Sequence, residues 1–150
     1  MTRPPRFPSR VRRVASGTPW EDAVGYCRAL RVGRFVFVSG TTATRPDGSV
    51  EGEGDPYRQA FRALTNLKSA LGRLGASPRD VVRTRMYVTR IEDWKEIGRA
   101  HREFFGAHPP VTTMVEVSRL IDPAMRVEIE ADAIVAPPRR GAPARRRALP

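Results

Sequence analysis

Residues 81–106, VVRTRMYVTRIEDWKEIGRAHREFFG, contain the change of hydrophobic period that decides the fold class. Over 81–89, Val82, Thr84, Met86 and Val88 alternate with Arg83, Arg85 and Tyr87, which is typical of a strand with one polar face. Over 94–105 the apolar residues recur every three or four positions, which indicates an amphipathic helix that ends before Gly106. A strand followed directly by a helix is therefore predicted.

The strand period of two and the helix period of three to four residues also occur before and after this segment. Further strands are predicted at 24–32, 35–41, 111–117 and 126–135, the first two joined at Gly33-Arg34, and a second helix at 56–74. The turn-rich segment 44–56 is expected to be a loop. This order of elements predicts an α+β fold with two layers, in which two helices cover one face of a mixed sheet of about six strands.

The charge of the chain lies mainly at its two ends. The 150 residues include 27 basic and 16 acidic residues, a net charge of +11, but residues 1–14 and 137–150 hold five arginines each and no acid. Without these arginines the chain carries +1. The sequence therefore predicts one domain over 15–136 between two disordered, basic, proline-rich tails, and nucleic-acid binding is not favoured because the tails offer a single aromatic residue for base stacking.

Composition also limits the compartment and the partners. No apolar run is long enough to span a membrane, the N-terminus lacks the apolar core of a secretory signal, and Cys27 is the single cysteine. A cytoplasmic location is expected. Two histidines seven residues apart do not suggest a metal site.

The sheet face without helices carries the candidate chemistry. Glu128 and Glu130 point to one face of a strand, followed by Asp132, so paired carboxylates could position water or relay protons. Alternatively, Arg83, Arg85 or Arg126 neutralise them across strands. The same face is partly apolar, and we expect a homo-oligomer to cover it.

Three stretches together resemble the Rid (reactive intermediate deaminase), or YjgF-like, family. They are RVGRFVFVSG (31–40), LGASPRDVVRTRMYVT (74–89) and FFGAHPP (104–110), the last followed by VEV (115–117) and VEIEA (127–131). The resemblance implies a chorismate-mutase-like fold and a homotrimer with small-molecule clefts between subunits. It also implies hydrolysis of 2-imino and enamino acids to 2-oxo acids and ammonia, without cofactor or metal.

The resemblance implies roles for individual residues. Tyr26 stands at the tyrosine of the family's Gly-Pro-Tyr motif, and Glu128 stands at the glutamate proposed to position the attacking water. Thr112 occupies the place of the arginine that binds the substrate carboxylate, so either the substrate lacks a carboxylate or another arginine, Arg28, reaches the cleft. The candidate catalytic residue is Glu128, and the candidate substrate-binding residues are Tyr26, Arg28, Ser39, Thr112, Thr113 and Met114.

These features predict a trimeric protein that hydrolyses an imine, an enamine or a related metabolite other than the standard 2-imino acid. Two alternatives stay open. The first is a metabolite-binding module of the same fold without turnover, and the second is nucleic-acid binding or endoribonuclease-like activity.

Overall fold

The computed structural model describes residues 11–137, which form one six-stranded mixed sheet with three α-helices. The strand order is β1-β2-β3-β6-β4-β5. All neighbouring strands are antiparallel except β4 and β5, which are parallel. The strands are β1 (Arg12–Val14), β2 (Ala29–Val32), β3 (Phe35–Thr41), β4 (Val81–Val88), β5 (Val111–Glu116) and β6 (Val127–Ile134).

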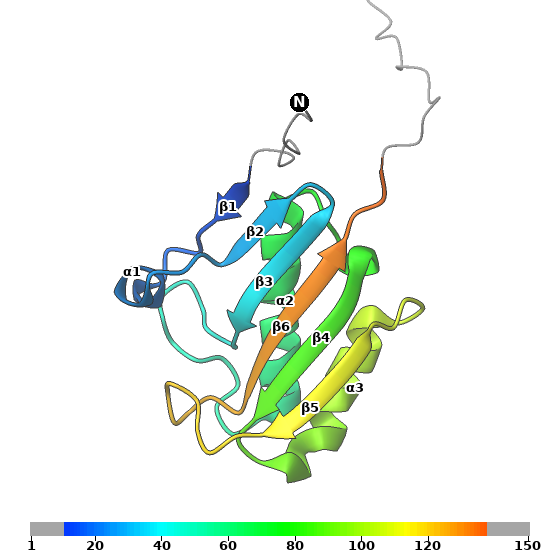
Figure 1. Cartoon of the computed structure of the whole chain (residues 1–150). Coiled ribbons are helices and arrows are strands. Elements are labelled where there is room, and N and C mark those ends of the chain that lie inside the picture. Colours follow the sequence, from blue (N-terminus) through cyan, green and yellow to red (C-terminus); the bar gives the residue numbers. More distant parts are fainter. Residues whose placement is uncertain (1–10, 138–150) are drawn as a thin grey trace, which may run out of the picture.

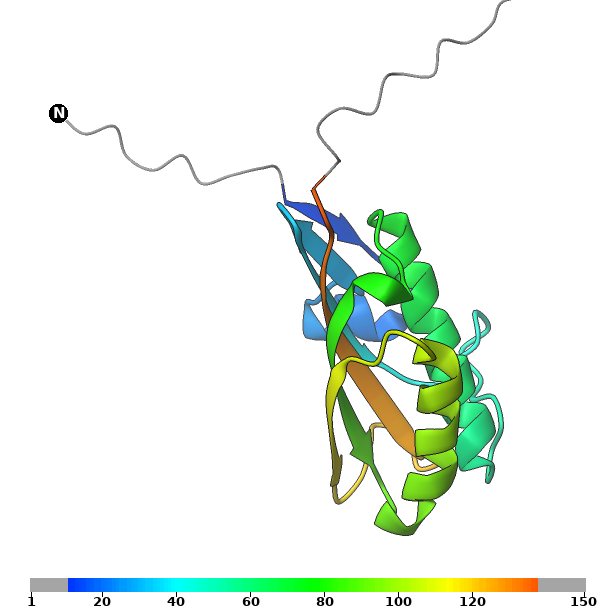
Figure 2. The same ribbon diagram turned by 90° about the vertical axis from the view of Figure 1, so that its right-hand side faces the viewer.

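Two long helices form the second layer. α2 (Pro56–Arg73) and α3 (Trp94–Phe105) lie together on one side of the sheet (Figures 1 and 2), and α3 is the crossover that lets β4 and β5 run parallel. A short helix, α1 (Pro19–Val24), lies beside β2 and β3 near one edge of the sheet. The predicted α+β architecture of two layers is confirmed. None of these helices is both long and apolar enough to cross a membrane.

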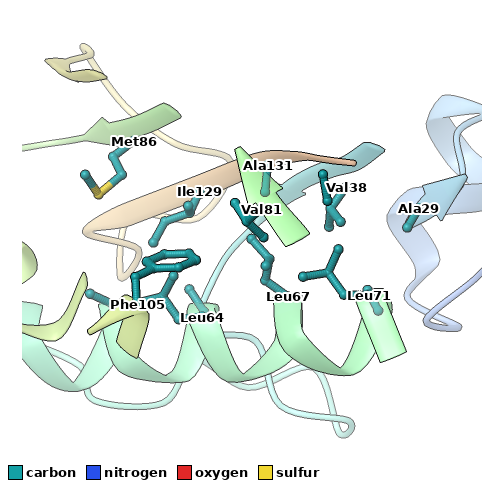
Figure 3. Packing of buried hydrophobic residues seen from close by; sticks show 14 of the residues in the cluster. Ala29, Val38, Leu64, Leu67, Leu71, Val81, Met86, Phe105, Ile129 and Ala131 are labelled. Carbon is teal, nitrogen blue, oxygen red and sulfur yellow. The ribbon is translucent and has the colours of Figure 1, made fainter. Parts of the chain in front are cut away.

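The core lies between the sheet and the long helices. Leu64, Leu67 and Leu71 on one stripe of α2 are fully buried, and they meet Val38, Ile129 and other apolar side chains of the sheet (Figure 3). Along β6, buried Val127, Ile129, Ala131 and Ala133 alternate with half-buried acidic residues, as the period of two predicts. One face of the sheet is thus core, and the acidic residues of β6 lie on the other face.

Several local predictions were wrong. Residues 24–28 are not a strand, because α1 ends at Val24 and Gly25 takes a left-handed conformation (φ 78°) that turns the chain before β2. In the predicted helix 56–74, the apolar residues that recur every three or four positions begin at Phe61, but this side chain is 44% exposed and lies outside the core. Val82 is exposed and Val81 is buried instead, because the register of β4 on β6 shifts between Val81 and Arg83.

The N-terminal boundary also differs from the prediction. Residues 12–14 were placed in the N-terminal tail, but they form β1, which pairs with β2. This strand forms through backbone pairing with β2, and three residues are too few for a side-chain pattern to predict it. The rest of the two predicted tails, 1–10 and 138–150, lies outside the described residues.

Candidate functional site

A cleft of about 570 Å³ opens where α1, the loop after β3 and the loop before β6 approach one another. Tyr26, Arg28, Ser39 and Glu128, four of the seven predicted site residues, line this cleft. They come from the turn before β2, the end of β3 and the beginning of β6. The fold therefore brings together side chains that are up to about one hundred positions apart in the sequence.

Of the arginines in the described part of the chain, three line the cleft. Arg45 pairs with Glu51 (3.4 Å), Arg73 donates to the Ala15 carbonyl, and Arg28 is the one whose charge lowers the pKa of Glu128. Arg28 is held by several hydrogen bonds. Its side chain is 11% exposed. Nη2 donates to the Tyr26 hydroxyl (2.7 Å), Nη1 donates to the Gly40 carbonyl and to Thr41 Oγ1 (3.1 Å), and Nε donates to Glu21 (3.4 Å). Within the described residues, four of its five N–H groups are thus already used. Arg28 can offer a ligand a single N–H, which is less than the two-pronged contact that binds a carboxylate best.

Glu21 is the counter-ion of Arg28, and no sequence motif pointed to it. It is 5% exposed and accepts hydrogen bonds from the backbone N–H groups of Ser16 and Gly17 and from the Ser16 hydroxyl (2.7 Å). Burial alone would raise the pKa of Glu21, but these hydrogen bonds and the one from Arg28 lower it overall. Glu21 thus ties α1, the segment before it and Arg28 into one unit.

Glu128 faces the cleft without a hydrogen-bond donor among the described residues. Its side chain crosses over Gly40, where a Cβ atom would displace the carboxylate, so the glycine leaves room for Glu128 in this position. Residues 39 and 40 lie in an irregularity of the β3–β6 ladder between Val38 and Thr41. Burial raises the pKa of Glu128, Arg28 lowers it and Glu130 adds a further increase, with a net rise. A half-buried carboxylate with free lone pairs is suited to accept a proton from water.

The neighbouring carboxylates are neutralised as the alternative interpretation expected. Arg85 contacts Glu130 (3.0 Å) and Asp132 (3.3 Å), and the Tyr87 hydroxyl also donates to Glu130 (3.2 Å). Of the other two candidates, Arg126 pairs with Asp93 instead, and Arg83 makes no ion pair with a described residue. Glu128 and Glu130 lie on the same face, as predicted, but they differ in partners. Glu128 is therefore the acid of this strand that is left for chemistry.

Ser39 connects β3 to the turn that carries Tyr26 and Arg28. Its hydroxyl donates to the backbone carbonyls of Cys27 (3.2 Å) and Arg28 (3.0 Å). With its proton used in this way, Ser39 can act toward a ligand as an acceptor only.

The three remaining site candidates are not in this cleft. Thr112, Thr113 and Met114 belong to β5, at the edge of the sheet and three strands away from β3. At about 4.8 Å per strand the separation is roughly 14 Å. Glu128 itself is on β6, two strands from β5, and Thr112 lies level with Ala131, three residues along β6 from Glu128. The two residues are therefore about 10 Å apart across the sheet and about 10 Å apart along it, so within one chain the position that the family resemblance assigned to carboxylate binding is not beside Glu128.

Thr112 belongs to a separate hydrogen-bonded chain with His101 and Thr84. The buried Thr84 hydroxyl donates to Thr112 Oγ1 (2.8 Å) and lies 2.9 Å from His101 Nε2. Because a hydroxyl has one proton, Thr84 must accept from His101, so the imidazole carries its proton on Nε2. The Thr112 proton is then free to point outward. His101 also packs on Phe105, with ring centroids 4.6 Å apart, and has a structural role here.

Burial lowers the pKa of His101, which makes the stability of the fold dependent on pH. The unfolded chain takes up the proton near pH 6.5, above the folded value, so the stabilisation is complete above 6.5 and is lost as the pH falls through the folded pKa. We expect the free energy of unfolding to decrease below about pH 6.5 and His101→Gln to remove this decrease, measured by urea denaturation across pH. Exposed His108→Gln is the control and should keep it.

Sequence reasoning missed four features that shape the cleft, namely Glu21, Gly40, Thr41 and Trp20. Glu21 and Trp20 lie in a helix that was not predicted because six residues are too few for a reliable period. Gly40 and Thr41 lie in a strand that was predicted, but their importance depends on the partner strand. Among the described residues, no three His, Cys, Asp or Glu side chains are arranged to hold a metal ion.

Comparisons with known proteins agree with this fold. The profile of the family described as "Endoribonuclease L-PSP" matches residues 18–135. A crystal structure from Mycobacterium tuberculosis, described as a member of the highly conserved YjgF/YER057c/UK114 family, is 48% identical, with a TM-score of 0.77 over 84% of this chain and 100% of that one.

Two curated relatives extend the comparison. An uncharacterized protein of Streptomyces coelicolor is 42% identical over 123 residues, 82% of this chain and 91% of its own. The human 2-iminobutanoate/2-iminopropanoate deaminase is 29% identical over 130 residues, 86% of this chain and 94% of its own. With its sheet of six strands and a family profile that covers almost all of the described residues, the chain belongs to the Rid, or YjgF-like, family.

Proposed function

We propose that this protein hydrolyses the C=N bond of a small imine, or of the imine form of an enamine, whose polar group is not a carboxylate. The observation that carries the proposal is the juxtaposition, in one cleft, of two side chains: Glu128, whose carboxylate has no hydrogen-bond donor within residues 11–137, and Arg28, whose N–H groups are nearly all used. The human relative named as an imine deaminase adds support for the reaction class.

The proposed reaction needs one water and no other reactant. Glu128 accepts a proton from water as the water oxygen bonds to the imine carbon, and the C=N electron pair moves to nitrogen. That proton passes to nitrogen, which gives a carbinolamine. Glu128 then takes the remaining proton from the new hydroxyl and delivers it to nitrogen as the C–N bond breaks, which leaves a carbonyl compound and ammonia. The raised pKa of Glu128 helps both steps, because a more basic carboxylate accepts a proton from water more readily and the same group can return it near neutral pH.

The hydrogen bonds of Arg28 support a neutral polar group on the substrate. A substrate carboxylate would have to compete with Glu21 and Thr41 for N–H groups, and it would lie near the Glu128 carboxylate. A carbonyl or amide oxygen needs one donor, which Arg28 can supply. This agrees with the threonine at position 112.

We also propose that the active assembly is a homotrimer. The open face of the sheet carries exposed Phe35, Phe37, Val111 and Val115, an apolar surface that association would cover. A neighbouring chain could then bring its β5, with Thr112, Thr113 and Met114, to the cleft. Sedimentation equilibrium should give three times the chain mass of 16.8 kDa, and a monomer at micromolar concentration would contradict this.

The test of the function is a paired set of imines made in situ. An amino-acid oxidase acting on leucine gives an imine with a carboxylate, and an amine oxidase acting on isoamylamine gives the matching imine without one. Imine loss is timed by trapping with semicarbazide, with and without the protein. We expect acceleration of the carboxylate-free imine and little or none of the other. Equal rates with and without protein for both imines would overturn the proposal and favour the binding module.

Endoribonuclease activity, the description printed for the family profile, is less well supported. Within the described residues neither His101 nor His108 lines the cleft, so an imidazole acid–base pair for phosphodiester cleavage is not assembled there. Glu128 would also repel a phosphate.

A further inference from the structure

The rim of the cleft is unusually apolar for an exposed surface. Trp20 and Val24 on α1 are 38% and 69% exposed, and Ile121 in the loop before β6 is 63% exposed, yet all three line the same cavity. Large apolar side chains that remain in water lose the hydrophobic free energy that burial would provide. Because these three side chains gather around one cavity, we expect a bound molecule to cover them.

The position of this rim is fixed by the fold. Trp20 and Val24 are four residues apart and so lie on the same side of α1, while Glu21 between them turns inward to Arg28. Pro19 at the first turn and the left-handed Gly25 set the two ends of the helix. The clamp between Glu21 and Arg28 thus holds the apolar rim at a set position relative to the polar groups of the cleft.

Polar groups also line the cavity. The Tyr26 hydroxyl, Arg28 and Glu128 line it, as do Asn66 and Arg73 of α2, so the lining combines polar groups with the apolar side chains of α1 and of the loop before β6. A volume of about 570 Å³ lies within the range of sites that hold drug-sized ligands, and it leaves much space around a small aliphatic imine. The polar group of a ligand would bind the polar side chains of the cavity, and the side chain of the ligand would contact the apolar ones.

We propose that the cleft selects substrates with a bulky apolar side chain, such as an aromatic ring, attached to a neutral polar head. The inference rests on the proposed function in treating this cleft as the substrate site. In the proposed trimer a second copy of the chain would border this cavity through its β5, but it is a less suitable occupant of the cavity itself, because these side chains surround a space that contains charged groups and do not form a flat apolar patch. Trp20 and Ile121 are accordingly specificity-determining residues.

The first experiment measures binding and needs no turnover. The chain contains two tryptophans, Trp20 and the exposed Trp94 of α3, so Trp94→Phe leaves Trp20 as the single indole reporter. Fluorescence is titrated with phenylacetamide, phenylacetate, acetamide and acetate, which vary the ring and the charge independently. We expect phenylacetamide to bind at least tenfold more tightly than acetamide, because the ring is buried, and more tightly than phenylacetate.

The second experiment locates the effect at the rim. Trp20→Ala and Ile121→Ala are each expected to weaken phenylacetamide binding at least threefold, measured by ligand-observed NMR, whereas Trp94→Ala, the matched control, leaves it unchanged. Equal affinity for phenylacetamide and acetamide would overturn the inference. A loss of oligomer mass in Trp20→Ala would overturn it too, in favour of a subunit contact.

The two proposals can fail separately. Tight phenylacetamide binding without hydrolysis of any imine would keep the ligand class and overturn the enzymatic function. Hydrolysis of small and bulky carboxylate-free imines at equal kcat/KM would keep the function and overturn the ligand class.

Discussion

Glu128→Gln should lower the turnover of a carboxylate-free imine by roughly 10²–10⁴-fold, the contribution typical of general acid–base catalysis. The amide retains the shape of the side chain over Gly40 but cannot accept a proton from water. The substitution should lower kcat. The measurement is the semicarbazide-trapping assay at saturating substrate.

The same substitution should not destabilise the protein. Burial raises the pKa of Glu128, so protonation of this carboxylate stabilises the folded state relative to the unfolded state. This stabilisation is lost as the pH rises through the folded pKa. At neutral pH the carboxylate therefore costs stability, and we expect Glu128→Gln to melt at or above the wild-type Tm. For wild type, activity should fall on the acid side at a pH above 4.5, the ordinary pKa of a glutamate.

Glu130→Gln is the matched control for Glu128→Gln. Glu130 lies two residues beyond Glu128 on the same face of β6, but its carboxylate contacts Arg85 and Tyr87. We expect it to retain turnover within a few-fold of wild type. Full activity in Glu128→Gln, or an equal loss in both variants, would show that Glu128 is not the catalytic base.

Glu21→Ala should destabilise the fold by about 3 kcal/mol, the lower end of the cost of removing one partner from a buried ion pair. The lower end is appropriate because Arg28 keeps Thr41, Tyr26 and the Gly40 carbonyl as acceptors. The substitution also leaves the N–H groups of Ser16 and Gly17 without their acceptor. Urea denaturation measures the change.

Asp22→Ala provides the control, because Asp22 carries the same charge in the same turn of α1 but is exposed. Its effect on the free energy of unfolding should stay within about 0.5 kcal/mol. If the two variants had equal stability, the clamp between Glu21 and Arg28 would have no energetic role. Any displacement of α1 in Glu21→Ala should also weaken phenylacetamide binding at the rim.

The sequence predicted the long elements well because each has its own period. The leucine stripe of α2 and the alternation in β6 each predict one buried face, and this prediction does not depend on which elements pack against that face. Short elements failed for the opposite reason. α1 and β1 have six and three residues, and their existence depends on Glu21 binding residues 16 and 17 and on backbone pairing with β2.

The candidate site was predicted in part. Tyr26 and Arg28 were expected to share a face of a strand, and they do converge, through a 2.7 Å hydrogen bond, although no strand forms there. Glu128 and Glu130 were expected to face the same side, but the sequence could not tell which one Arg85 would neutralise. That choice depends on the register between β4 and β6, where Arg85 lies opposite Glu130.

By itself, the sequence determined the two-layer α+β architecture and the presence of paired acids on the face of the sheet without long helices, because local periodicity carries this information. The family followed from the resemblance of three stretches to known motifs. The tertiary structure decided which residues form the cleft. The glycine at position 40 leaves room for the carboxylate of Glu128, and Thr112 lies outside the cleft because three strand spacings separate β5 from β3. Arg28 is nearly saturated because four acceptors, from Glu21, Tyr26, Gly40 and Thr41, surround it. Each of these depends on contacts between segments that are separate in the chain, and only strand register and packing bring such segments together.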